Sequence, residues 1–130
     1  PYAWGDSRAS GPALAWLLGR LAFGDLVSPV HRDLAVGLLE QAALAQPWGV
    51  APLGAGRDPR SVVGAKDGWY PVDAGWRAGS AGLVFSATDG APGGTSYSIA
   101  VFTAENLLLD DGIETIDGFA SRIHAALAPR

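Results

Sequence analysis

The spacing of the apolar residues changes twice along the chain, and this constrains the fold more than any other feature of the sequence. Up to residue 47 the apolar residues recur three or four positions apart, as on one face of an amphipathic helix. Between residues 62 and 103 they alternate as in half-buried strands, and after residue 109 the helical spacing returns. The sequence therefore predicts an α+β fold with the order α-α-β-β-β-α.

Two helices are predicted in the first 47 residues. Ser10-Gly11-Pro12 and Ser28-Pro29 each place a hydroxyl N-cap before a proline in the first helical turn. Gly24 ends the first helix and Gln46-Pro47 the second, and the short turn at residues 25–27 predicts an αα-hairpin. The residues expected to face the core are Leu14, Leu17, Leu18 and Leu21 in the first helix and Leu34, Ala35, Leu38, Leu39 and Ala42 in the second.

A three-stranded antiparallel sheet and a closing helix are predicted in the second half. The opening strand begins at Val62-Val63 and runs toward Lys66 within VVGAKDGWYP. The other two strand segments are SAGLVFSAT (80–88) and SYSIAVFT (96–103), which the turn-rich DGAPGGT joins as a hairpin. The closing helix is expected to pack along the sheet, with Asp110 and Asp111 favouring its N-terminus. Its predicted apolar stripe is Ile113, Ile116, Ala120, Ile123 and Leu127.

We expect residues 1–130 to form a single partial domain. Residues 1–47 would be a loop and the helical hairpin, residues 48–60 a surface connection rich in glycine and proline, and residues 61–130 the sheet with its helix. The opening residues PYAWGDSRASGP are typical of the middle of a loop, so a fragment or a processed chain is expected.

The composition excludes several classes of function. A hydrophobic content of 48% over 130 residues is enough to bury a core. A net charge of −4 with scattered arginines argues against a nucleic-acid partner, and no apolar run is long enough to span a membrane. The absence of cysteine excludes disulfides and thiolate metal sites.

Lys66, the only lysine, is the strongest candidate for a site residue. Small residues precede it and Gly68 follows it, so its ammonium is expected to emerge near the end of a strand with open space around it. Gly68 would let a ligand or an oxyanion approach the backbone, with the N–H of Trp69 as a donor. The alternative is a strand that simply ends in an ordinary Asp-Gly turn.

The remaining polar residues predict no second site. His31 and His124 are expected to be helix-surface or packed histidines, so we predict neither a metal nor a cofactor. The acidic residues around position 110 are expected to belong to a solvated loop and a helix N-terminus, not to a catalytic pair. Val63 stands three residues before Lys66, so the sequence contains no serine and lysine one helical turn apart.

Four segments together resemble a known family. GAKDGWYP, WRAGSAGLVF, SYSIAVFT and GIETIDGFASRIHAAL, in that order, resemble the last part of the class A β-lactamase-related serine hydrolases of the penicillin-recognising superfamily. The two predicted helices resemble the stretch that follows the omega loop in that family. The resemblance covers essentially the whole chain but only about the C-terminal half of the family domain. Its most specific part is K-D-G-W-x-P followed by W-x-x-x-S-x-G.

The resemblance implies a role for several residues. Lys66 takes the place of the third-motif lysine that helps to hold a substrate carboxylate, and Gly68 that of the motif glycine. The backbone N–H of Trp69 would be half of an oxyanion hole. Asp67 stands at the substrate-binding position where the family has Ser or Thr, and as an aspartate it would repel a carboxylate or pair with Lys66. Arg77, by period-two counting, is a weak substitute for the family's carboxylate-binding arginine.

Two functions follow from the resemblance. The first is a serine hydrolase that acts by acyl transfer on a β-lactam, a peptidoglycan-type peptide or a related amide or ester. The second is a catalytically inactive relative with a binding or structural role at the cell envelope, which Asp67 favours. Both imply a secreted or cell-envelope protein and, as partner, the N-terminal half of the same fold. In the first function, that half carries the nucleophilic serine.

Overall fold

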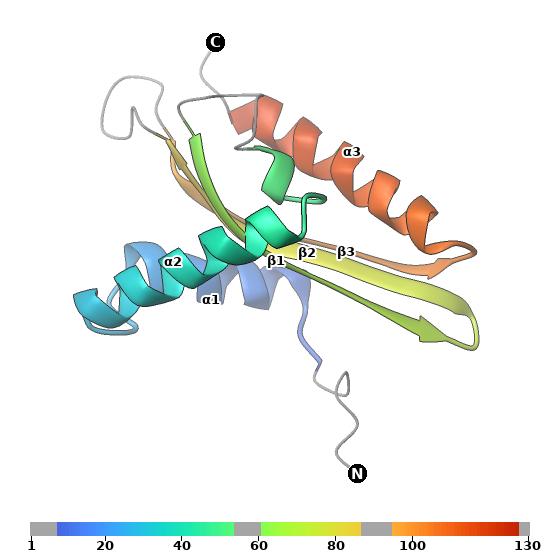
Figure 1. Ribbon diagram of the computed structural model, residues 1–130, viewed down its shortest axis with the longest axis horizontal. Coiled ribbons are helices and arrows are strands. Elements are labelled where there is room, and N and C mark those ends of the chain that lie inside the picture. Colours follow the sequence, from blue (N-terminus) through green and yellow to red (C-terminus); the bar gives the residue numbers. More distant parts are fainter. Residues whose placement is uncertain (1–7, 54–60, 87–94, 128–130) are drawn as a thin grey trace.

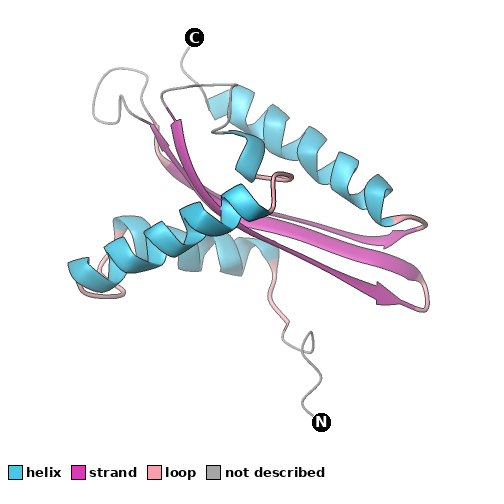
Figure 2. Ribbon diagram, in the orientation of Figure 1, coloured by secondary structure: helices cyan, strands magenta, loops and turns pink. Residues whose placement is uncertain are grey.

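The computed structural model describes residues 8–53, 61–86 and 95–127. The elements, in chain order, are α1 (Gly11–Phe23), α2 (Pro29–Ala45), the short 3₁₀ helix η1 (Ala51–Leu53), β1 (Ser61–Val72), β2 (Gly75–Ser86), β3 (Tyr97–Asn106) and α3 (Leu109–Leu127). The α-helices surround one antiparallel sheet (Figures 1 and 2). The predicted α+β class and the order of helices and strands are confirmed.

The described residues form three layers with the sheet in the middle (Figure 1). The strand order is β1-β2-β3, so β1 and β3 are both edge strands. The two N-terminal helices lie on one face, where α1 packs on β3 and β2 and α2 packs on β1. The opposite face is covered by α3 and η1. We call these the α1/α2 face and the α3 face.

The first strand is longer than the sequence predicted. β1 continues through Asp67-Gly68 to Val72, and the tight turn to β2 falls at residues 73 and 74. Lys66 therefore lies in the middle of a 12-residue strand, so the prediction that it stands near a strand end is wrong, as is the alternative of an Asp-Gly turn. β2 begins at Gly75, five residues before the predicted start, because the two strands pair along their whole length. Most of the predicted turn DGAPGGT lies outside the described residues.

The helix starts follow the capping chemistry of the sequence at one of the two sites. Ser10 accepts a hydrogen bond from the Ala13 N–H at 3.3 Å and caps α1. Ser28 precedes the proline of α2 as predicted, but its hydroxyl bonds to Nδ1 of His31 at 3.0 Å and does not cap the backbone. The proline alone therefore marks the start of α2.

The helix faces are rotated relative to the predicted stripes. In α2, Leu34 is 60% exposed and Leu38 57% exposed, while Ala43 is buried. In α3, Ile116 and Ala120 are buried as predicted, but Ile123 and Leu127 are exposed. Period alone does not reveal which apolar side chains of each helix stay exposed among the described residues. Among the described residues, no helix combines the length and the hydropathy that a membrane span requires.

The core lies on the α3 face of the sheet. η1 and the residue before it insert Val50, Ala51 and Leu53 between β1, β2 and α3. Glycines in the strands make room for this packing, because a Cβ on Gly82 would lie 2.9 Å from Cγ1 of Val50. The connection predicted as a surface loop is therefore, over residues 49–53, part of the core.

Tyr97 ties β3 to α3 through a hydrogen bond of 2.7 Å to Nδ1 of His124. Burial raises the pKa of Tyr97 to about 12, so the phenol remains protonated. We expect Tyr97→Phe to lower the free energy of unfolding by about 1 kcal/mol, because it deletes one partly buried hydrogen bond. Chemical denaturation of Tyr97→Phe, His124→Ala and the double variant measures this. Strictly additive effects of the two changes would contradict the assignment.

Candidate functional site

The candidate site lies where the chain passes from one face of the sheet to the other. α2 ends at Ala45 on the α1/α2 face, whereas η1 lies on the α3 face, so residues 46–53 pass around the free edge of β1. We call residues 46–53 the crossing segment. It contains no ionisable side chain. Gln46 and Val50 make its polar contacts with the sheet, and Gly49 makes one with α3.

Gln46 holds Lys66 at the edge of the sheet. The Lys66 ammonium donates to Oε1 of Gln46 at 2.9 Å and also donates to the backbone carbonyl of Asp67. The same Oε1 accepts the Asp67 N–H at 3.0 Å. Lys66 is exposed, and it forms no ion pair with any described residue. Its charge is therefore available to an anionic ligand at this edge.

The backbone of β1 offers a second donor on the same edge. Both the N–H and the carbonyl of Asp67 bond to side chains, those of Gln46 and Lys66, and not to the backbone of β2. In an antiparallel ladder every second residue points its backbone groups the same way, so the N–H of Trp69 also points out of the β1 edge. Pro71 continues this series, as expected for a proline in an edge strand.

Gly68 leaves free space beside this donor. It is exposed, and a Cβ built on it would meet no atom within 4 Å. The side-chain positions of Lys66 and Gly68 lie on the α1/α2 face, because their strand partners Ala81 and Gly79 belong to that face. Lys66, the bare backbone at Gly68 and the outward N–H of Trp69 thus lie together at the edge of β1.

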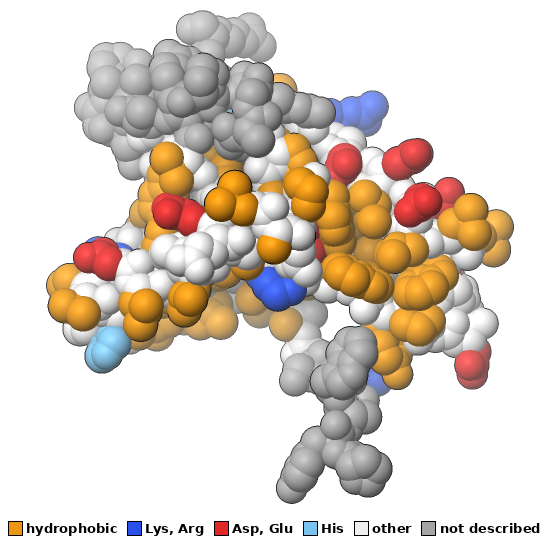
Figure 3. Space-filling view, viewed as in Figure 1, with side chains coloured by type: hydrophobic (Ala, Val, Ile, Leu, Met, Phe, Trp, Pro, Cys, Tyr) orange, Lys and Arg blue, Asp and Glu red, His pale blue; other side chains and the backbone are white. Residues whose placement is uncertain are grey.

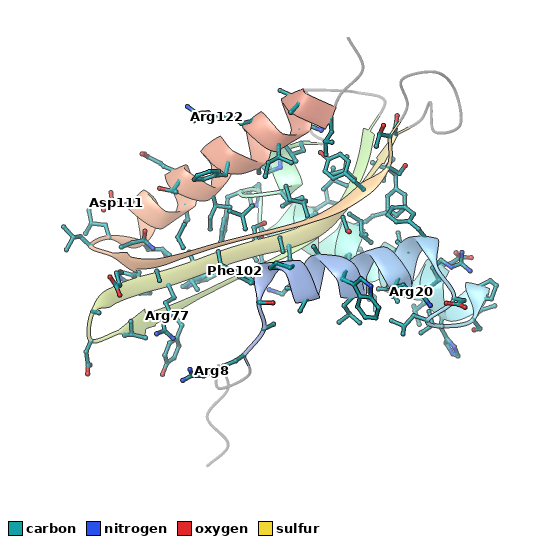
Figure 4. The ribbon with its side chains drawn as sticks, turned by 180° about the vertical axis from the view of Figure 1, so that it is seen from behind. Arg8, Arg20, Arg77, Phe102, Asp111 and Arg122 are labelled. Atoms are coloured by element: carbon teal, nitrogen blue, oxygen red, sulfur yellow. The ribbon has the colours of Figure 1, made fainter. Side chains whose placement is uncertain are left out.

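Two predicted site groups lie apart from Lys66. Arg77 is on the same face, and Figure 4 shows it on the α1 side of the sheet, but it pairs with Tyr70. That register places it four residues, or about 13 Å, along the strand from Lys66. The indole of Trp69 lies on the α3 face, where its ring centroid is 6.1 Å from that of Trp48.

Asp67 is the main departure from the predicted arrangement. Neighbouring residues of a strand point to opposite faces, so its carboxylate lies on the α3 face, away from the Lys66 ammonium. The side chain is only 3% exposed, and neither carboxylate oxygen has a hydrogen-bond partner among the described residues. The Lys66–Asp67 ion pair considered from the sequence is therefore absent, and the carboxylate is not placed to contact a ligand at Lys66.

Burial of this carboxyl group changes its acidity. Desolvation raises the pKa of Asp67 from 3.8 to about 6, with a smaller raising effect from Asp117. The nearby Ser80 hydroxyl and the charge of Lys66 oppose this rise without cancelling it. The carboxyl group of Asp67 therefore changes from neutral to charged as the pH rises through about 6.

Asp117 and Ser80 hold the crossing segment above Asp67. Asp117, on α3, accepts the Gly49 N–H at 2.5 Å, and Ser80, on β2, accepts the Val50 N–H at 2.9 Å. Gly49 has φ of +65°, and a Cβ on it would lie 2.3 Å from Oγ of Ser80 and 3.4 Å from Oδ1 of Asp67. Only glycine allows the backbone to lie this close to both side chains.

The histidines do not add a second site. His31 bonds to Ser28 at the start of α2, and His124 bonds to Tyr97. Within residues 8–53, 61–86 and 95–127, no three acidic, histidine or cysteine side chains are grouped so that they could hold a metal ion. Asp110 and Asp111 are exposed in the first turn of α3, as predicted, and Asp111 accepts the Leu108 N–H at 3.2 Å.

Two residues important to the site could not be assigned from the sequence. The sequence indicates only a helix end at Gln46, because an amide beside a proline gives no signal for a contact with β1. Asp117 interrupts the apolar stripe of α3, which is a weak sign of a special environment, but no local pattern links it to Gly49. Both contacts join segments that are distant in the sequence.

Comparison with known proteins identifies no relative. No protein-family model matches the chain, and none of the curated proteins matches it. The resemblance to β-lactamase-related hydrolases thus remains a prediction that rests on the quoted segments.

Proposed function

We propose that the chain is part of a β-lactamase-like serine hydrolase, secreted or at the cell envelope, that transfers an acyl group from a β-lactam, a peptidoglycan-type peptide or a related amide or ester. The observation that carries the proposal is the set of groups on the β1 edge: the exposed Lys66 ammonium, the open space at Gly68 and the outward N–H of Trp69. A positive charge beside a backbone donor suits a substrate carboxylate next to a developing oxyanion.

The attacking hydroxyl is assigned to polypeptide outside residues 1–130. The only lysine lacks a serine one helical turn away, so this chain by itself offers no activated hydroxyl of that type. Large apolar side chains of α1 and α2 are exposed among the described residues and support the presence of such a partner; they include Trp16, Val30, Leu34 and Leu38. Figure 3 shows hydrophobic side chains gathered over α2 and over the adjoining part of the sheet.

A second function is favoured by Asp67. The family places Ser or Thr after the motif lysine, where a neutral hydroxyl donates to the substrate. Here that position is a buried carboxylate that faces away from Lys66. This supports the alternative of an inactive relative that keeps a binding or structural role at the cell envelope.

Acylation by a fluorescent penicillin separates the two functions. We expect the protein, expressed from its complete coding sequence, to gain the mass of the opened β-lactam. We expect Lys66→Ala to slow this step about 100-fold, because it removes the charge that the substrate carboxylate needs. The matched control is Arg122→Ala, whose side chain lies on the outer side of α3 (Figure 4) and should leave the rate unchanged.

The outcome is read by intact mass and by a chromogenic β-lactam. Turnover of the chromogenic substrate identifies a hydrolase, and a stable adduct without turnover identifies an acyl-binding protein. No adduct on any polypeptide of the purified protein would refute the acyl-transfer proposal for β-lactams and favour the inactive relative. An equal rate for Lys66→Ala and Arg122→Ala would refute the role of Lys66.

A further inference from the structure

The buried carboxylate of Asp67 has no function in the proposed acyl transfer, yet its burial opposes folding when it is charged. Its two oxygens are shielded from solvent, and the interactions that favour its charged form, with the Ser80 side chain and with the charge of Lys66, do not cancel the effect of burial. An uncompensated buried charge costs several kcal/mol unless it is neutralised. Such a group persists where its neutral form is compatible with the packing around it.

A second carboxylate, that of Asp117, also lies next to Gly49 of the crossing segment. Asp117 accepts the Gly49 N–H, and Oδ1 of Asp67 lies within 3.4 Å of the position that a Gly49 Cβ would take. Ser80 of β2 accepts the N–H of the next residue, Val50. The segment is therefore hydrogen-bonded to the carboxylate of Asp117 and to the hydroxyl of Ser80, and the carboxylate of Asp67 lies beside Gly49.

No described cation forms an ion pair with either carboxylate, and Arg122 of α3 lies on the outer side of that helix (Figure 4). β2 contributes only Ser80 around Asp67, the crossing segment has no ionisable side chain, and α3 contributes Asp117. Lys66 neighbours Asp67 in β1, but its ammonium bonds to Gln46 at the strand edge, and its attraction only partly offsets the burial. When both carboxyl groups are ionised, like charges face each other under Gly49.

We propose that Asp67 and Asp117 form a proton-dependent clamp on the crossing segment. While Asp67 carries a proton, the segment is held in place between Asp117 on α3 and Ser80 on β2. When Asp67 loses its proton, lifting of the segment lets water reach the new charge and releases Asp117 from Gly49, so the open form gains population. The clamp does not depend on the proposed acyl transfer. It affects the same edge because Gln46, which holds Lys66, belongs to the segment.

The pH range of the clamp follows from the environment of Asp67. Burial places its pKa at about 6 in the closed form, whereas hydration in the open form returns it toward 3.8. Opening is therefore favoured as the pH rises through about 6. Near pH 5 the segment should be mostly closed.

Two NMR measurements on the wild-type chain test the clamp. The side-chain carboxyl ¹³C shift of Asp67 should titrate with a midpoint near 6. The exchange protection of the Gly49 and Val50 amides, corrected for the intrinsic pH dependence of exchange, should fall about tenfold or more between pH 5 and pH 7.5. A midpoint near 4, or protection that does not change with pH, would overturn the proposal.

Three variants isolate the two carboxylates. Asp67→Asn imitates the protonated state, so the protection of Gly49 and Val50 should become independent of pH. Asp117→Asn keeps an acceptor oxygen for Gly49 but removes the second charge, so the midpoint of Asp67 should fall. Asp73→Asn, in the exposed turn between β1 and β2, is the matched control and should behave as wild type. Unchanged pH dependence in Asp67→Asn would contradict the clamp, whatever the result of the acylation assay.

Discussion

Replacing Asp67 with asparagine is expected to raise the free energy of unfolding near pH 7.5 by about 2 to 3 kcal/mol and to leave it almost unchanged near pH 4. The pKa of Asp67 is raised by burial from 3.8 to about 6 in the folded chain. The folded state therefore binds more protons than the unfolded state between these two values. By linkage, the contribution of Asp67 to stability falls as the pH rises through this window and stays low above about pH 6.

The sign of this effect distinguishes Asp67 from most carboxyl groups. A carboxylate with a folded-state pKa below 3.8 would stabilise the protein at neutral pH, and its replacement by asparagine would be destabilising there. Urea denaturation of wild type, Asp67→Asn and the control Asp73→Asn at several pH values measures the difference directly. A stability difference for Asp67→Asn that does not grow between pH 4 and pH 7.5 would contradict the raised pKa.

Gly49→Ala is expected to lower the free energy of unfolding by about 3 kcal/mol or more. The backbone of Gly49 has φ of +65°, which costs a residue with a side chain about 1 to 2 kcal/mol. The added methyl group would also lie 2.3 Å from Oγ and 2.4 Å from Cβ of Ser80. Ser80 is fully buried in the central strand and cannot move aside, so the overlap adds about 1 to 3 kcal/mol.

Gly37 provides the matched control in α2. A Cβ on Gly37 would meet no atom within 4 Å, and alanine is favoured over glycine inside a helix by about 0.5 to 1 kcal/mol. Gly37→Ala should therefore stabilise the chain, while Gly49→Ala destabilises it. Thermal or urea unfolding of both variants measures the two effects.

A second variant separates strain from steric overlap at Gly49. In a Ser80→Gly background the overlap with Oγ and Cβ disappears, so Gly49→Ala should cost only the backbone term of about 1 to 2 kcal/mol. An equal cost of Gly49→Ala in both backgrounds would show that the crossing segment does not lie against Ser80. That result would also remove the geometric basis of the clamp.

The stability of the chain and the chemistry of the β1 edge are connected through one short segment. Residues 46–53 supply Val50 and Leu53 to the core, Gly49 to the two carboxylates and Gln46 to Lys66. A change at Asp67 is therefore expected to influence Lys66 although the two side chains lie on opposite faces of β1. Trp48 and Trp69, with ring centroids 6.1 Å apart, give an intrinsic fluorescence signal for the same movement.

The β1 strand shows how far local patterns extend. Alternation already implies that Lys66 and Asp67 point to opposite faces, provided that the strand continues past them. The dipeptide Asp67-Gly68 is a common turn signal, so the local pattern predicts that the strand ends there. Pairing of β1 with β2 along all 12 residues outweighs this local preference.

The sequence by itself determined the class and order of the elements, because its signals act within a few residues: a capping serine, a proline in the first helical turn and the spacing of apolar side chains. It also singled out Lys66 and Gly68 on one strand. Tertiary structure alone decided that β1 is an edge, that Gln46 holds the lysine, and that Asp117 reaches the turn above Asp67. These contacts depend on how the chain passes around the sheet, and the free energy that selects them comes from burying distant residues together.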